Sequence, residues 1–225
     1  MSKVNDYFDK LFTKIPGYVF GILTFVIGSS GFIIAILLSP EYVMWEKSIS
    51  VLGHHTGGIF SRLGLIISNT IAIPALIYLS RSLKDENVNE KVRKIALGTG
   101  IFVSVIAALS GIVTGSAQII KDIHGFFALL SWIGGIIVCL SFGLLMLKSS
   151  KYSKSAANFS FVIAGIFGSF LVPFFITNFC SAVPDICGSF GRRVYTIMPI
   201  YEWIVMFSIL SWYLFNSIYT LKNKL

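Results

Sequence analysis

The chain has 225 residues, of which 55% are hydrophobic and only 12% are charged, and its mean hydropathy is +0.82. Soluble domains carry about 25% charged residues, so this composition excludes a soluble globular domain, a disordered chain and a nucleic-acid-binding module. The formal net charge of +8 is first a sign of membrane topology in such a chain, and only then a sign of an anionic partner.

The first segment, residues 1–16, has apolar residues at helical spacing with Lys and Asp between them. We expect it to form an amphipathic helix that lies on the inner membrane surface. The alternative is a frayed polar tail. The apolar positions are Val4, Tyr7, Phe8, Leu11, Phe12 and Ile15.

Six apolar stretches follow, each close to the roughly 20 residues that a helix needs to cross a bilayer. We therefore predict an all-α bundle of six transmembrane helices over residues 17–221, followed by a short cytoplasmic tail, 222–225. The predicted spans are Gly17–Leu38, Ile59–Leu79, Ile95–Val113, Ile123–Met146, Phe159–Phe179 and Ile197–Tyr219.

The 18 basic residues are divided unevenly between the two sides of this bundle. Thirteen belong to the N-terminus, the C-terminus and the loops after the second and fourth spans, whereas Lys47, Lys121, Arg192 and Arg193 belong to the other side and Arg62 lies near its edge. The positive-inside rule then places both termini in the cytoplasm of a multi-pass cell-membrane protein. Most of the net charge thus needs no partner besides anionic membrane lipids.

The three cysteines fall in two settings. Cys139 lies within the fourth span, where a small buried hydrophobic residue is expected. Cys180 and Cys187 share one outer loop, in which Pro184 favours a turn. Because the outside of most cells is oxidising, we expect a disulfide between them; the alternative is two unpaired thiols.

Ionisable residues gather on the predicted outer side, whereas the inner half of the bundle has no acid or histidine within a span. Such groups are costly inside a membrane and indicate function by default. Each has a structural alternative: His124 with Asp122 as a helix N-cap, Glu202 in an ion pair with Arg62, and loop or surface positions for the rest. The candidate ligand-binding residues are Ser48, Ser50, His54, His55, Arg62, His124, Arg192, Arg193 and Glu202.

Several functions compete for this cluster. The leading hypothesis is a protein that binds a lipid or polar ligand in an outward-facing pocket, with the arginines holding an anionic group. The second is a metal-dependent lipid hydrolase or transferase, with zinc on His54 or His55 together with His124 and either Asp122 or Glu46. A haem between two histidines and a small-molecule transporter, which requires a cavity that reaches the midplane, are further alternatives.

Two sequence stretches resemble a known family. Residues 38–53, LSPEYVMWEKSISVLG, followed by 59–67, IFSRLGLII, and 122–128, DIHGFFA, are similar to the prokaryotic six-helix membrane family called domain of unknown function 998. A more distant similarity is to the Frag/DRAM/Sfk membrane family, some of whose members act in lipid-anchor maturation. The resemblance implies a six-helix membrane fold and a connection with lipids. At position 51, where the resemblance leads us to expect an acidic residue, this chain has Val51.

Overall fold

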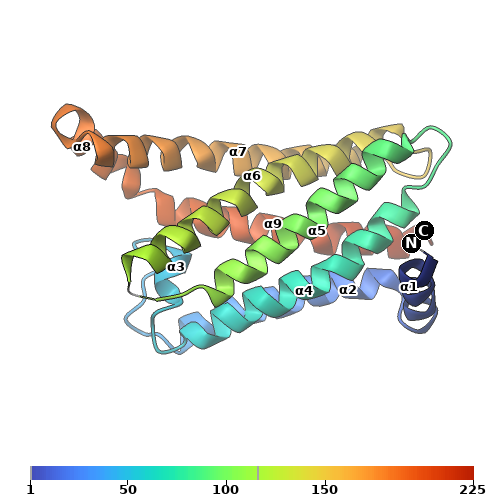
Figure 1. Cartoon of the computed structure of the whole chain (residues 1–225), viewed down its shortest axis with the longest axis horizontal. Helices are drawn as coiled ribbons and strands as arrows, with labels where there is room; N and C mark the ends of the chain where they lie inside the picture. Colours follow the sequence, from blue (N-terminus) through green and yellow to red (C-terminus); the bar gives the residue numbers. More distant parts are fainter. Residues whose placement is uncertain (1, 116) are drawn as a thin grey trace.

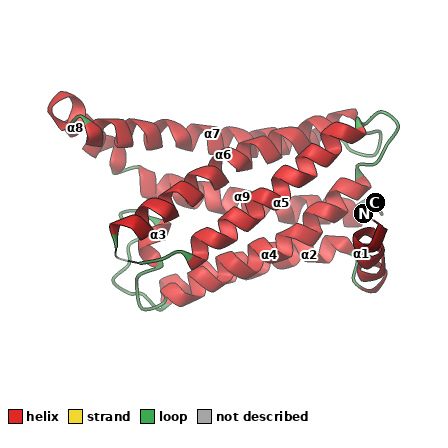
Figure 2. Cartoon of the chain, in the orientation of Figure 1, coloured by secondary structure: helices red, strands yellow, loops and turns green. Residues whose placement is uncertain are grey.

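A computed structural model describes residues 2–115 and 117–225, and the predicted all-α architecture is confirmed (Figures 1 and 2). Six helices are long and apolar enough to cross a membrane. Each helix contains its predicted span, except that the span ends Leu38, Val113 and Ile197 lie one residue outside the helix. These helices are α2 (Gly17–Leu37), α4 (Gly58–Ser82), α5 (Glu90–Ile112), α6 (Gln118–Lys148), α7 (Lys154–Ala182) and α9 (Met198–Lys222).

The helices form a closed ring in chain order. Each long helix packs against the next, and α9 closes the ring because it packs against both α7 and α2. The short connections make successive helices antiparallel neighbours. Both termini therefore lie at one end, the termini end, together with the loops 83–89 and 149–153. The opposite end, the α3–α8 end, is the one that the positive-inside rule predicts to face outward.

Helix α6 continues beyond its predicted span, which changes the position of Asp122. Helix α6 begins at Gln118 instead of Ile123, and its 31 residues extend for about 46 Å at 1.5 Å per residue. Asp122 is therefore inside the helix, where its carboxylate accepts a hydrogen bond of 2.7 Å from the Gln118 side chain. The expectation that Asp122 caps the helix is wrong, since Ala117 occupies that position.

Helix α8 (Pro184–Tyr195) occupies the predicted outer loop and packs on α7. The disulfide between Cys180 and Cys187 is present, with the two Cα atoms 5.1 Å apart, so this prediction is confirmed. The contact also depends on Gly191, because a Cβ atom there would lie 2.5 Å from the Cβ atom of Cys180. The predicted outer loop thus consists of two short helical pieces that meet at a kink at Cys187, where the disulfide fastens α8 to the end of α7.

Helix α1 (Ser2–Lys14) forms where the amphipathic segment is predicted, although Met1 lies outside the described residues. The aromatic ring of Phe12 in α1 packs against Phe20 of α2 and Tyr78 of α4. Arg81 of α4 binds Asp9 at 2.6 Å and lies over the Phe12 ring. These contacts fix α1 beside the first two spans at the termini end, while its place on the membrane surface stays a prediction.

Helices α2 and α4 approach each other most closely at two glycines. A Cβ atom on Gly31 would lie 2.7 Å from the Cα atom of Gly64 and 2.8 Å from the carbonyl oxygen of Phe60. Small residues allow such close backbone packing in membranes, where the lipid supplies no hydrophobic force between helices. This contact aligns α2 with the outer half of α4.

Substitution Gly31→Ala is expected to destabilise the bundle by about 1–3 kcal/mol, because the added methyl group meets backbone atoms that cannot move away. The matched control is Gly98→Ala, since a Cβ atom on Gly98 of α5 meets nothing within 4 Å. Thermal unfolding in detergent measures both changes. Equal stability of the two variants would show that the α2–α4 contact tolerates a side chain.

At the termini end, Asp85 joins the loops 83–89 and 149–153. Its carboxylate accepts hydrogen bonds from the Ser150 hydroxyl at 2.6 Å, from the Ser150 backbone N–H at 2.8 Å and from the Asn87 backbone N–H at 3.0 Å. These donors hold the pKa of Asp85 well below its ordinary value. The carboxylate form is therefore favoured by the folded protein.

Substitution Asp85→Asn is expected to lower the stability at neutral pH, because the amide nitrogen cannot accept from these donors. A carboxylate with a depressed pKa stabilises the fold above its unfolded pKa, and this stabilisation is lost as the pH falls. The difference in stability between wild type and variant should therefore stay constant from pH 7 to about pH 5 and narrow as the pH falls further toward about pH 3. Unfolding midpoints of wild type and Asp85→Asn across this pH range test this prediction. A stability difference that does not change with pH would contradict the role of the ionised Asp85 carboxylate.

Candidate functional site

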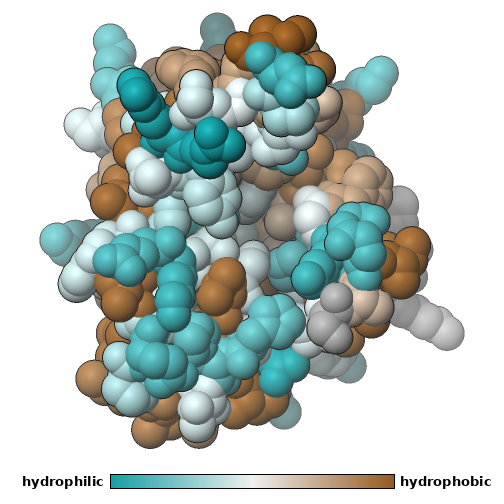
Figure 3. All heavy atoms as spheres, turned by 90° about the vertical axis from the view of Figure 1, so that its left-hand side faces the viewer, coloured by the Kyte–Doolittle hydropathy of each residue, from teal (hydrophilic) through white to brown (hydrophobic). Residues whose placement is uncertain are grey.

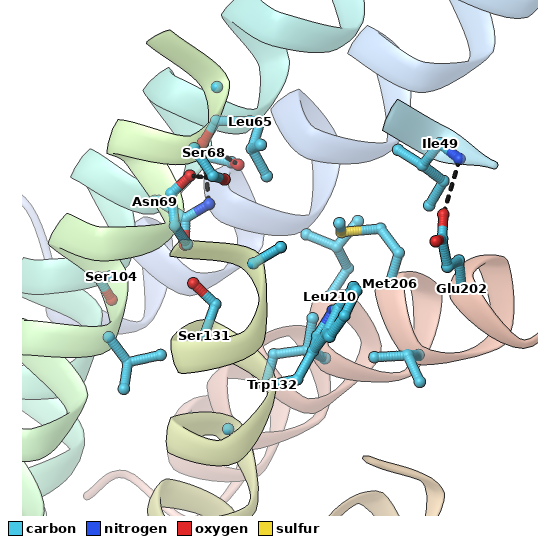
Figure 4. A pocket seen from close by; sticks show the side chains of 18 of the residues that line it. Ile49, Leu65, Ser68, Asn69, Ser104, Ser131, Trp132, Glu202, Met206 and Leu210 are labelled. Carbon is cyan, nitrogen blue, oxygen red and sulfur yellow. Dashed lines mark hydrogen bonds between the residues drawn. The ribbon is translucent and has the colours of Figure 1, made fainter. Parts of the chain in front are cut away.

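A cavity of about 160 Å³ lies within the ring of helices, and all six long helices and α3 (Ile49–Leu52) contribute to its wall (Figure 4). On α6 its lining residues run from His124 to Val138, which is about 21 Å along the helix axis. The cavity therefore extends from the α3–α8 end to the middle of the bundle. Figure 3 looks onto this end, where hydrophilic side chains surround a paler centre.

The cavity brings together four of the nine predicted ligand-binding residues: Ser50, Arg62, His124 and Glu202. The other five are elsewhere. Ser48 is the N-cap of α3, His54 is exposed, His55 binds Glu41, and Arg192 and Arg193 are exposed on α8. The structure thus brings the central members of the predicted polar cluster together, whereas the arginines of α8 lie apart from them, because that helix packs on α7. A ligand-binding role for any of these residues stays a prediction.

Arg62 brings a positive charge into the cavity wall from the second turn of α4. Its Nη1 atom donates a hydrogen bond of 2.8 Å to the Thr114 hydroxyl, and its buried Nε atom has no hydrogen-bond partner. Within the part of the chain that the structure describes, Arg62 forms no ion pair with a carboxylate. The candidate ion pair with Glu202 is therefore not formed.

Glu202 instead holds the short helix α3. Its Oε2 atom accepts a hydrogen bond of 2.8 Å from the backbone N–H of Ile49 (Figure 4). Ile49 is the first residue of α3, and the first N–H groups of a helix have no partner within it. Because α9 begins at Met198, Glu202 lies about 6 Å along that helix, level with α3.

The next residue of α9 strengthens the same attachment. The indole N–H of Trp203 donates to the Tyr42 hydroxyl at 3.2 Å, and this hydroxyl donates to the Lys47 carbonyl oxygen at 2.8 Å. Burial raises the pKa of Tyr42 to about 12, so its hydroxyl remains a donor at physiological pH. The loop that carries α3 is thus fastened to α9 at two adjacent positions.

The neighbours of His124 determine which nitrogen of its ring carries the hydrogen. Its Nδ1 atom lies 2.9 Å from the carbonyl oxygen of Ser110 and 3.0 Å from that of Val113. Because carbonyl oxygens only accept, Nδ1 carries a hydrogen. These carbonyl groups belong to the C-terminal end of α5, where carbonyl oxygens lack helical partners. The Nε2 atom faces the Ser50 hydroxyl at 3.1 Å and, in the neutral ring, accepts from it.

The residues of the predicted metal site do not converge. His55 binds Glu41 at 2.7 Å, Asp122 binds Gln118, and only His124 of the three histidines lines the cavity. Among residues 2–115 and 117–225, no group of three or more His, Cys, Asp or Glu side chains is placed to hold a metal ion. The zinc hypothesis therefore lacks its ligand set, and a haem between two histidines lacks its second histidine at the cavity.

Sequence reasoning missed the deeper polar residues of the cavity, because Ser and Gly at helical spacing within a span also indicate close helix packing. The sequence signal for this part of the cavity is the helical spacing of Ser104 and Gly111 on α5 and of Ser131 and Gly135 on α6. The polar side chains of the lining are Thr24, Ser50, Ser61, Arg62, Ser68, Asn69, Ser104, Ser110, Thr114, His124, Ser131, Glu202 and Tyr213.

Comparison of the chain with family profiles, curated proteins and solved structures finds no match. The resemblance to domain of unknown function 998 and to the Frag/DRAM/Sfk family thus stays a prediction.

Substitution Glu202→Ala is expected to destabilise the protein by about 1–3 kcal/mol, because it leaves the partly buried N–H of Ile49 without a partner. Glu202→Gln keeps an acceptor oxygen and serves as the control. Thermal unfolding measures the stability, and limited proteolysis between residues 39 and 57 measures the release of the loop. If the alanine variant were as stable and as resistant as the glutamine variant, Glu202 would not hold α3.

Proposed function

We propose that the protein binds a lipid in this cavity, with the anionic headgroup on Arg62 and an acyl chain along the inner wall. The observation that supports it is the guanidinium group of Arg62, which faces the cavity with a neutral hydroxyl as its hydrogen-bond partner. A buried charge is costly unless it is paired. A phosphate or carboxylate group suits a guanidinium because both can form two parallel hydrogen bonds.

The deeper wall suits a hydrocarbon chain. Several lining hydroxyl groups donate to carbonyl oxygens of their own helices: Thr24 to Phe20, Ser61 to Gly58, Ser68 to Leu65, and Ser131 to Phe127. Such bonds satisfy the hydroxyl hydrogen within the helix. The remaining lining is mainly aliphatic and aromatic, with Leu65, Val138 and Phe167 among its members. The cavity thus offers a charged group near its outer end and an apolar wall below it, as an amphiphile requires.

A small-molecule transporter is the second candidate, and the depth of the cavity favours it. A route across the membrane would also have to pass the termini end. There the ring is filled by a core cluster that includes the buried side chains of Phe142, Met146 and Trp212. A transporter would need these residues to move apart, whereas lipid binding uses the cavity as it stands.

The test is the retention of phosphatidylglycerol by the purified protein in detergent, measured by native mass spectrometry. Arg62→Gln is expected to weaken retention about tenfold or more, since a charge-assisted contact is lost. Arg193→Gln is the matched control, because this arginine is exposed on α8 and outside the cavity. Equal retention by wild type and Arg62→Gln would overturn the proposal.

A further inference from the structure

The contact between Ser50 and His124 has the geometry of a nucleophile and its base. The Ser50 Oγ atom lies 3.1 Å from His124 Nε2, and both side chains line the cavity. A serine is activated when a neighbouring base accepts its proton and a third group orients that base. Here the carbonyl oxygens of Ser110 and Val113 orient the imidazole through Nδ1. The lone pair of Nε2 therefore points at the serine.

We propose that Ser50 and His124 cleave a carboxylic ester of a lipid bound in the cavity. This inference rests on the proposed lipid binding, because the cavity must deliver the ester to the pair. It differs from the metal-dependent hydrolase considered above, since the nucleophile is a side chain and no metal ion takes part.

The position of Ser50 suits this role. It lies in α3, whose first N–H is held by Glu202, so the attachment to α9 also fixes the serine. Ser50 is exposed, and its hydroxyl group is thus accessible to a substrate. The imidazole comes from α6, the hydroxyl from α3, and the orienting carbonyl groups from the end of α5. Three separate segments converge on one contact.

Arg62 supplies positive charge to the same site. Its side chain passes along the α3 turn, because a Cβ atom on Gly53 would lie 3.8 Å from Arg62 Cγ. Its partner Thr114 directly follows Val113, whose carbonyl oxygen faces His124. The unpartnered Nε atom of Arg62 is a donor for the negative charge that develops on an ester oxygen. Arg62 thus holds the headgroup anion and also supplies positive charge for the ester oxygen.

The reaction balances with water as the only co-substrate. The Ser50 oxygen bonds to the ester carbonyl carbon while its proton passes to His124 Nε2. The bond from that carbon to the alcohol oxygen then breaks, and the leaving oxygen takes the proton from Nε2. Water next attacks the acyl-serine, gives one proton to Nε2 and releases the carboxylic acid, and the proton returns to Ser50. One ester and one water yield one acid and one alcohol.

The test is covalent labelling of the purified full-length protein by a fluorophosphonate, in which the serine oxygen displaces fluoride from phosphorus. Peptide mass spectrometry should find the adduct on Ser50. Ser50→Ala should abolish the adduct, and His124→Gln should slow labelling about 100-fold, because the base is lost. Ser48→Ala is the matched control, since Ser48 is in the same segment but outside the cavity lining; it should label like the wild type.

Thermal unfolding confirms that each variant is folded. Absence of an adduct on Ser50 in folded wild-type protein would overturn the proposal, and so would equal labelling rates in wild type and a folded His124→Gln variant. Release of fatty acid from phosphatidylglycerol, lost in Ser50→Ala, supports it with a natural ester.

Lipid retention separates this proposal from the previous one. If Ser50→Ala retains phosphatidylglycerol and loses only labelling, both proposals are supported. If wild type retains phosphatidylglycerol through Arg62 but never labels, the catalytic proposal fails and lipid binding stands. If Ser50 labels but Arg62→Gln retains the lipid like the wild type, the binding proposal fails instead.

Discussion

A membrane bundle has to satisfy its backbone and buried polar groups from within, because hydrocarbon offers no hydrogen bonds. Most of this protein follows that constraint closely. Many hydroxyl groups within the spans, such as those of Ser68 and Ser131, donate to carbonyl oxygens one turn away, and Glu202 and His124 provide partners at the ends of α3 and α5. Against this background the guanidinium of Arg62 is exceptional, since its charge is matched only by a neutral hydroxyl. This imbalance makes Arg62 the part of the cavity wall best suited to an anion.

Hydrophobic length and charge distribution were sufficient to predict the long helices, because both express the thickness and polarity of the bilayer. The ends of the helices were less predictable. Polar residues such as Gln118 and Asp122 extend α6 beyond its apolar stretch, and the segment around Cys187, where the sequence indicates a turn, forms two short helical pieces of α8 that meet at a kink at Cys187. In both places tertiary contacts and a covalent bond add stability that local sequence does not reveal.

The candidate site was predictable in its residue types but not in its pairings. Costly ionisable groups identified Arg62, His124 and Glu202. Their partners turned out to be the Thr114 hydroxyl, two carbonyl groups and a backbone N–H, which carry no distinctive sequence signal. An ion pair was the natural expectation for Arg62 and Glu202. The fold instead directs the carboxylate toward α3, whose first N–H has no other partner.

Closure of the ring by its last member, α9, has a consequence for biosynthesis. The N-terminal part of a chain leaves the ribosome first, so α2, α4, α5 and α6 enter the membrane while one side of the future cavity is still open to lipid. The loop that carries α3 gains its hydrogen bonds to α9 only when Glu202 and Trp203 arrive. The cavity is therefore completed only with the final span, at the moment when a neighbouring membrane molecule can be enclosed.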